Sequence, residues 1–313
     1  MKEKILLDTD IGTEVDDAIT LAYLLANPAC DLVGVTTSCG ESIRRAELAS
    51  ALCRAAGRPE VPIHAGCEEP LFIPQMEKYA PQASILDKWE HDTGFRPNTA
   101  VPFMQKVIRD NPGEVTILAI APLTNLATLF AIDPEIPSLL KGVMMLCGNP
   151  THRRYDMATE GLSAMDRDDS TRIFASQGIL ENNAIVDPHA TSLVYRAPIA
   201  AHRTVGSDCS SVPVMTPEEA KDRFRHPALQ PVMAIAGEWF KDDPRVSFHD
   251  PLAAVCIFHD DVCRFERGRI DIELDSARLA GFTYWRPDAA GPHSVAVEVN
   301  QERFFGHLFE VFG

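Results

Sequence analysis

Short apolar runs alternate with longer amphipathic stretches, and this alternation constrains the fold of the chain more than any other feature. The apolar runs lie at 5–7, 32–37, 115–121 and 143–146, and the amphipathic stretches that follow them lie at 17–27, 42–56, 124–131 and 168–177. Strand–helix–strand units of this kind build a mostly parallel sheet with helices on both faces. The sequence therefore predicts an α/β fold with a twisted central sheet, whose ligands bind at the carboxyl ends of the strands.

The domain organisation follows from what the chain lacks. Its 313 residues contain no internal repeat, low-complexity tract or interdomain linker, and 45% of them are apolar, enough for one large core. We therefore expect a single α/β domain over 1–313. Two segments, 66–100 and 206–228, show no clear period, and we expect them to be long loops that line or cover a site.

The charge balance excludes several classes of partner. Acidic residues outnumber basic ones by 45 to 29, which gives a net charge of −16 and argues against a nucleic-acid partner. The same excess suits a site for a hard cation. No apolar run approaches the ~20 residues that span a bilayer, so no membrane partner is expected. Eight cysteines without a C-x-x-C pair indicate reduced thiols and a cytoplasmic location.

Carboxylates are concentrated between the first predicted strand and the first predicted helix. Five of them fall within ten residues, at Asp8, Asp10, Glu14, Asp16 and Asp17. Several anions at one strand end repel each other unless a cation compensates, and oxygen ligands favour Ca²⁺ or Mg²⁺ over softer metals. An Asp at position 16 could instead cap the helix that follows, but capping does not explain the remaining carboxylates.

Three motifs, in the same order along the chain, resemble those of the inosine-uridine preferring nucleoside hydrolases. Asp8 to Asp17 resembles the D-x-D-x-G-x-D-D signature of that family, with two extra residues between Gly12 and Asp16. Residues 121–127 resemble the G-P-L-T-N-hydrophobic-A motif, and His249 to Ala253 match H-D-P-hydrophobic-A. The resemblance extends over almost the whole chain. It implies a nucleoside-hydrolase-like α/β fold.

The resemblance also implies a function, a cofactor and roles for individual residues. It implies that one Ca²⁺ supports hydrolysis of the N-glycosidic bond of a ribonucleoside or related pentosyl compound, with Asp10 as general base and His249 assisting the departing base. The implied calcium ligands are Asp10, Asp17, Asp250 and the backbone carbonyl of Thr124. The implied substrate-binding residues are Asp16, Glu41, His91 and Glu160. A homo-oligomer, dimer or tetramer, is implied as well.

Two departures from the family pattern bear on the substrate. The family has Asn after Gly in the loop that follows its second strand, and here Glu41 stands at that place. The family also has an Asn at the end of an E-F-N segment. When Glu160 is aligned to the Glu of that segment, Leu162 stands at the place of this Asn. These changes predict a pocket poorly fitted to inosine and uridine, and a different or modified pentosyl substrate.

Two other functions are compatible with the acidic cluster. Asp8 to Thr13 also resembles the D-x-D-G-T motif of haloacid-dehalogenase-like phosphatases, which use Mg²⁺, and Asp166 to Asp169 could supply their later acidic pair. The inserted Ile11 interrupts that motif. The chain could also be a non-catalytic ribose- or nucleoside-binding protein. Release of phosphate from para-nitrophenyl phosphate, or binding of ribose without release of a base, would distinguish these functions.

Overall fold

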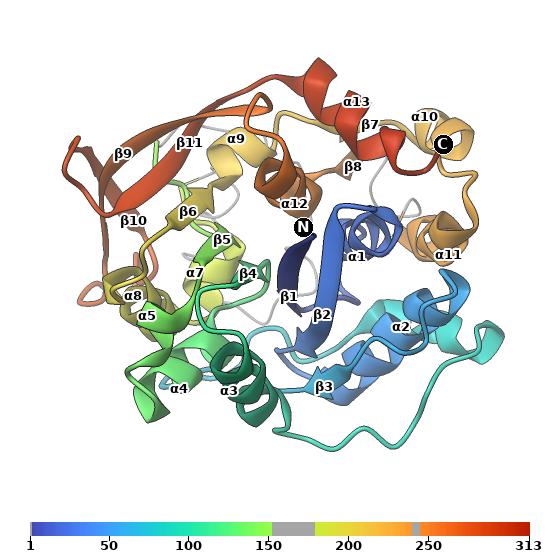
Figure 1. Cartoon of the computed structure of the whole chain (residues 1–313), viewed down its shortest axis with the longest axis horizontal. Coiled ribbons are helices and arrows are strands. Elements are labelled where there is room, and N and C mark those ends of the chain that lie inside the picture. The colour runs from blue at the N-terminus through green and yellow to red at the C-terminus, as the bar shows by residue number, and fades with distance from the viewer. Residues whose placement is uncertain (1, 152–178, 240–244) are drawn as a thin grey trace.

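A computed structural model of the chain describes residues 2–151, 179–239 and 245–313 (Figure 1). The described residues form a sheet of nine strands in the order β10-β9-β11-β6-β5-β4-β1-β2-β3. The strands are β1 (Glu3–Thr9), β2 (Cys30–Thr37), β3 (Ile63–Ala65), β4 (Val115–Ala119), β5 (Gly142–Leu146), β6 (His202–Val205), β9 (Cys263–Ile272), β10 (Thr283–Pro287) and β11 (His293–Val299). The sheet is mixed but mostly parallel, which confirms the predicted fold class.

Helices cover both faces of this sheet. The helices are α1 (Asp16–Ala26), α2 (Ser42–Ala55), α3 (Ala100–Asp110), α4 (Thr124–Ile132), α5 (Ile136–Leu139), α7 (Asn182–Val186), α8 (Pro188–Arg196), α9 (Ser207–Ser210), α10 (Pro217–Arg223), α11 (Gln230–Trp239), α12 (His249–Phe258) and α13 (Gln301–Glu310). Figure 1 shows α3, α4, α5 and α8 together on one side and α1, α11, α12 and α13 on the other. The helix expected at 168–177 lies outside the described residues.

The pleat of β1 divides the hydrophobic core into two clusters. Ile5 and Leu7 pack into a cluster with α1, α2, α11 and α12, whereas Leu6 packs into a second cluster with α3, α4 and α8. Successive side chains of a strand point to opposite faces of the sheet, so a central strand covered on both faces is apolar at every position. This explains why the run at 5–7 is continuous rather than alternating.

The strand order places a topological switch point beside β1. β1 pairs in parallel with β2 on one side and with β4 on the other, and the chain builds the sheet outward in both directions from there. Crevices at the carboxyl ends of strands next to such a switch are the usual ligand sites of open α/β sheets. Asp10 directly follows β1 and Ile120 follows β4, so both lie at this crevice.

The two segments expected to be loops differ from each other. Segment 66–100 carries the short 3-10 helix η1 (Pro81–Lys88) and ends at Ala100, the first residue of α3. Segment 206–228 instead contains α9, the strand β7 (Val214–Met215) paired with β8 (Val246–Ser247), α10 and the start of η3 (Pro227–Leu229). The prediction of one long loop there was wrong because local capping outweighs the missing period: Thr216 and Glu219 form a reciprocal capping box on α10.

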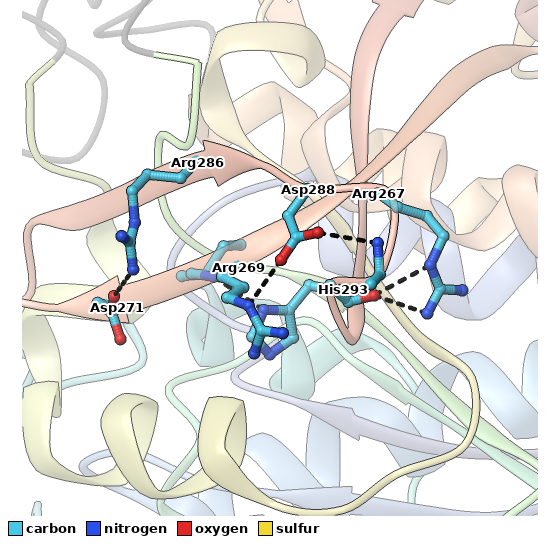
Figure 2. A network of polar contacts seen from close by, with 9 residues as sticks. Arg267, Arg269, Asp271, Arg286, Asp288 and His293 are labelled. Carbon is cyan, nitrogen blue, oxygen red and sulfur yellow. Dashed lines mark hydrogen bonds and ion pairs between the residues drawn. The ribbon is translucent and has the colours of Figure 1, made fainter.

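An antiparallel hairpin, absent from the sequence-based expectations, forms one edge of the sheet. β9 pairs antiparallel with β11 and with β10, the outermost strand. Figure 2 shows the charged side chains of this edge, where Arg286 donates to Asp271 at 3.3 Å and Arg269 to Asp288 at 2.8 Å. Charged side chains on an edge strand discourage pairing with another chain.

All eight cysteines lie in the described ranges and form no disulfide. None of the helices in 2–151, 179–239 and 245–313 is long and apolar enough to cross a bilayer.

Candidate active site

A cavity opens at the switch point, at the carboxyl ends of β1, β4 and β5. Its floor includes Ile120 and Leu146, which belong to or follow β4 and β5. Seven carboxylates line its walls: Asp10, Glu14, Asp16, Asp17, Glu77, Glu181 and Asp250. Among the described lining residues His249 is the one imidazole, and there is no Lys or Arg. The cavity is therefore strongly acidic, as a cation-binding site would be.

Three carboxylates from two helices converge in this cavity. Asp16 and Asp17 begin α1, and Asp250 lies in the first turn of α12; one oxygen from each lies within 4.8 Å of the others. Asp16 does not cap α1, because Val15 occupies that position; instead Asp16 Oδ2 accepts from the backbone N–H of Asp250 at 3.3 Å. The carboxylate that could have capped its own helix thus joins two helices that are more than 200 residues apart in the sequence.

Each of these three carboxylates is buried. Asp17 Oδ1 accepts from Thr9 Oγ1 at 2.5 Å. Asp250 is 3% exposed, yet its Oδ1 has no hydrogen-bond partner among the described residues. A buried carboxylate oxygen without a donor carries a desolvation cost that a cation would offset.

The pKa values of the cluster show how strongly its charges oppose each other. Burial first, and then the neighbouring Asp16 carboxylate, raise the pKa of Asp17 to about 8. Burial and the charges of Asp16, Asp17 and Asp10 raise the pKa of Asp250 well above its usual range. Burial and the Asp17 charge raise the pKa of Asp10 similarly. A cation between these oxygens would favour their ionised forms, so the arrangement fits a metal site.

Asp10 occupies the loop between β1 and α1, and a buried arginine fixes that loop. Arg45 of α2 has no exposed surface, and its guanidinium donates to the carbonyl of Asp10 and to Thr13 Oγ1, the latter at 3.1 Å. It also donates to the carbonyl of Gly40 at 2.9 Å. No sequence pattern indicates this role, because an Arg in an amphipathic helix is usually exposed.

His249 also lines the cavity, and it is the first residue of α12. Ser210 Oγ, from α9, lies 2.8 Å from His249 Nδ1. If the hydroxyl donates to Nδ1, then Nε2 carries the proton of the neutral ring. Ser210 and Ser207, which also lines the cavity, belong to the segment 206–228.

The start of α7 contributes cavity-lining residues that the sequence analysis did not single out. Glu181, Asn182 and Asn183 line the cavity. Glu181 caps α7 and accepts from the backbone N–H of Gly148 at 2.7 Å, while Asn183 Nδ2 donates to the carbonyl of Ile120 at 3.0 Å. Glu181 and Asn183 have the Glu-x-Asn spacing of the E-F-N segment. That spacing was the signal available in the sequence, where the prediction had aligned Glu160 to this Glu.

The remaining predicted residues have different places. Glu160 and Leu162 lie outside the described residues. Thr124 does not line the cavity: its Oγ1 donates to Asp187 Oδ2 at 2.8 Å, whereas Ile120, four residues earlier, does line it. Glu41 is exposed and accepts from the N–H of Ala80 at 2.8 Å. His91 Nδ1 lies 2.7 Å from the carbonyl of Trp89, and His91 is not among the described lining residues.

A switch-point cavity whose carboxylates converge on one point defines an α/β enzyme with a metal-type acidic site. The chain matches the inosine-uridine preferring nucleoside hydrolase model over residues 5–306. It belongs to that family, and it is a hydrolase that acts on N-glycosyl bonds. This membership decides against the phosphatase alternative.

Known proteins resemble the chain over nearly its full length. It is 26% identical to the inosine-uridine preferring nucleoside hydrolase of Crithidia fasciculata, with 99% of this chain and 97% of that protein covered. It is 25% identical to probable uridine nucleosidase 1 of Oryza sativa subsp. japonica, with 87% and 82% covered. The fold matches the purine-preferring ribonucleoside hydrolase from Gardnerella vaginalis with a TM-score of 0.80 at 18% identity, over 99% and 98%. Because these names differ in the base, they do not define the base that this chain accepts.

Proposed function

We propose that this protein hydrolyses the N-glycosidic bond of a ribonucleoside or related pentosyl compound in a calcium-dependent reaction, giving free base and sugar. The observation that carries the proposal is the convergence of buried Asp16, Asp17 and Asp250 beside Asp10 in one cavity. Family membership supplies the reaction class, and these side chains suit its chemistry.

The donor set suggests which residues would hold the ion. Asp10, Asp17 and Asp250 offer carboxylate oxygens, the hard ligands that Ca²⁺ prefers. We place the backbone ligand at Ile120 in place of Thr124, because Ile120 lines the cavity at the end of β4 and Thr124 does not. When bound, the ion would acidify a water molecule and hold vicinal hydroxyls of the sugar.

The protein's own groups can move the two protons that the reaction requires. A new bond forms between the water oxygen and C1′ of the sugar as the bond from C1′ to the base nitrogen breaks. Asp10 would accept the proton that the water loses, as general base. His249, held by Ser210, would donate a proton to the departing base.

The sugar would lie between the α1 wall and the α7 wall. Asp16 can accept from one sugar hydroxyl, and Glu181 and Asn183 face the same cavity from the other side. This placement replaces Glu160 and Leu162 as the proposed Glu-x-Asn pair. It also removes the strongest argument that inosine and uridine are poor substrates.

The test is release of base and reducing sugar from inosine, uridine and other ribonucleosides by the purified protein. We expect turnover with calcium, loss of turnover with a chelator, and recovery when calcium is restored. Calcium should also raise the unfolding temperature, since a ligand at 100 times its Kd stabilises by about 2.7 kcal/mol. Binding of ribose without any hydrolysis would favour the non-catalytic alternative instead.

Assembly and location are further parts of the proposal. We expect a dimer or tetramer acting in the cytoplasm, in salvage of purines or pyrimidines, by family resemblance. Phe72, Tyr79 and Ile132 are large apolar side chains with more than half of their surface exposed in the single chain. Light scattering coupled to size-exclusion chromatography would measure the number of copies.

A further inference from the structure

Glu77 is a buried carboxylate of the cavity that has no part in the proton transfers or in the proposed metal site. It lies in the segment 66–100, is 5% exposed and lines the cavity together with Asp10 and Asn182. Its charge is close enough to raise the pKa of Asp10 and of Asp17. A carboxylate placed beside other anions at a cost in free energy needs a compensating partner.

The backbone of Glu77 is fixed by close packing. The N–H of Gly40 donates to the carbonyl of Glu77 at 3.1 Å, and a Cβ on Gly40 would lie 2.5 Å from that oxygen. The N–H of Glu77 donates to Gln75 Oε1 at 2.8 Å. Only glycine at position 40 allows this approach, so the Glu77 segment is held against the turn after β2.

One oxygen of the Glu77 side chain is satisfied and the other is not. Oε1 accepts from Asn182 Nδ2 at 2.5 Å, which ties the side chain to the α7 wall. Oε2 has less than 1 Å² of exposed surface and no hydrogen-bond partner among the described residues. An ionised carboxylate only accepts hydrogen bonds, so the missing partner must be a donor, and the described part of the chain does not provide one.

We propose that Glu77 Oε2 accepts a hydrogen bond from a ribose hydroxyl of the substrate and so contributes to sugar specificity. This inference rests on the proposed function. The sugar would lie between Asp16 and the Glu181–Asn183 pair, and Glu77 borders that space through Asn182 and Asp10. Glu77 would thereby bind the sugar in place of Glu41, whose carboxylate accepts from Ala80 N–H outside the cavity.

The same carboxylate could instead bind a metal. Asp10, Cys39 and Glu77 are all buried and offer ligand atoms within 4.8 Å of one another. Cys39, however, does not line the cavity, so a ligand in the cavity would reach Glu77 without reaching the thiol. We therefore favour the hydroxyl, and metal binding becomes one outcome of the test.

The experiment compares the wild type with Glu77→Gln and with Glu69→Gln, an exposed residue of the same segment. Each protein is assayed with its preferred ribonucleoside and with the 2′-, 3′- and 5′-deoxy forms of that nucleoside. In Glu77→Gln the carbonyl of the new side-chain amide can still accept from Asn182, and the repulsion with Asp10 and Asp17 is reduced, so the unfolding temperature should not fall. The NH₂ group of that amide, however, cannot accept the hydroxyl proton, so the hydrogen bond to a charged acceptor is lost even when the hydroxyl turns to accept from the amide.

We expect Glu77→Gln to lower kcat/KM for the ribonucleoside by about 10- to 100-fold, the range for a hydrogen bond to a charged group. For one deoxy nucleoside the wild type and Glu77→Gln should be nearly equal, and Glu69→Gln should match the wild type throughout. Calcium affinity should fall by less than about 10-fold, since the proposed ligands are kept and the variant loses only a charge that lies near them.

Three results would overturn the inference. Equal loss on all deoxy nucleosides would indicate a structural role, and loss of calcium binding in Glu77→Gln would make Glu77 a metal ligand. An unchanged kcat/KM in an active Glu77→Gln would leave the hydrolase function intact and remove only this inference. Absence of hydrolysis in the wild type would instead contradict the proposed function itself.

Discussion

The surroundings of Asp10 act on the ionisation of its carboxyl group in two opposite ways. Burial and the neighbouring Asp17 charge oppose its ionisation, while Arg45 next to its backbone favours it. The sequence identified Asp10 by its place after a strand in an acidic motif. The arginine that steadies its loop comes from α2, and only the fold brings the two together.

At this position we predict that Asp10→Asn lowers kcat by about 10²–10⁴-fold, the usual contribution of a general base. Calcium affinity should fall less than in Asp17→Ala, because the amide oxygen of Asn still coordinates. Rates and calcium titrations of both variants test this, with Asp31→Asn at an exposed position of β2 as the control. Nearly normal turnover in Asp10→Asn would remove it from the role of base.

His249 should matter only when the leaving group needs a proton. We predict that His249→Ala slows hydrolysis of a ribonucleoside by about 10²–10⁴-fold. The loss should be much smaller for para-nitrophenyl riboside, whose leaving group is stable as an anion. Comparison of kcat on the two substrates measures the difference, and equal losses would contradict protonation of the base by His249.

At the scale of elements, Asn125 joins the ends of several strands. Its Nδ2 donates to Asp8 Oδ1 at 2.8 Å and to the carbonyl of Thr37 at 3.1 Å, and its Oδ1 accepts from the N–H of Cys67 at 2.9 Å. The first two partners belong to β1 and β2, and Cys67 follows β3. The Asn of the P-L-T-N motif therefore acts on the framework of the site rather than on the substrate.

We predict that Asn125→Ala lowers the free energy of unfolding by about 2–4 kcal/mol, because it removes three hydrogen bonds and leaves their buried partners without a donor or acceptor. Urea denaturation measures this, and Gln301→Ala at the exposed start of α13 is the control. A change below about 0.5 kcal/mol would show that water replaces the amide.

Helices and strands with a clear hydrophobic periodicity could be predicted from the sequence. Those that depend on local capping or on long-range strand pairing could not. The central strands and α1, α2 and α4 lie within a few residues of their predicted ranges. A strand buried on both faces must be apolar throughout, and the helices that cover it show an amphipathic pattern. The β9–β10 hairpin was missed, since its ten- and five-residue strands carry exposed charges that resemble a loop.

At the scale of the whole molecule, a buried histidine pair lies far from the acidic cavity, where β6 meets β11. His202 and His293 have ring centroids 4.7 Å apart, and His293 Nδ1 accepts from the N–H of Ile270 at 2.8 Å. Nε2 of His293, which lies 2.8 Å from the carbonyl of Tyr195, must then carry the proton. Burial, and then the neighbouring His293, lower the pKa of His202 to about 3.

This pair predicts a loss of stability in acid. Between pH 6.5 and about 3 the unfolded chain binds a proton at His202 that the folded chain does not, so stability falls as the pH drops, by at most about 1.4 kcal/mol per unit. The His202 ring stacks on Tyr195 with centroids 5.3 Å apart, so His202→Phe keeps an aromatic ring there and should reduce this slope. Unfolding free energies measured at about pH 5, 6 and 7 test it, because the slope lies in this window. Identical slopes in both proteins would contradict the prediction.

The sequence by itself determined the fold class, the reaction class and the acidic residues Asp10, Asp16, Asp17 and Asp250. The fold class followed from strand periodicity and the N-terminal carboxylates from their close spacing, which are local properties of the chain, whereas the reaction class and Asp250 followed from the resemblance of its motifs to a known family. The tertiary structure alone assigned the cavity contacts of Glu77, Glu181 and Asn183, and put Ile120 rather than Thr124 at its floor. Glu181 and Asn183 share a Glu-x-Asn spacing, but Glu77 and Ile120 belong to no spaced pair of carboxylates or amides. These residues come from separate segments, and only the order of the strands brings them to one crevice.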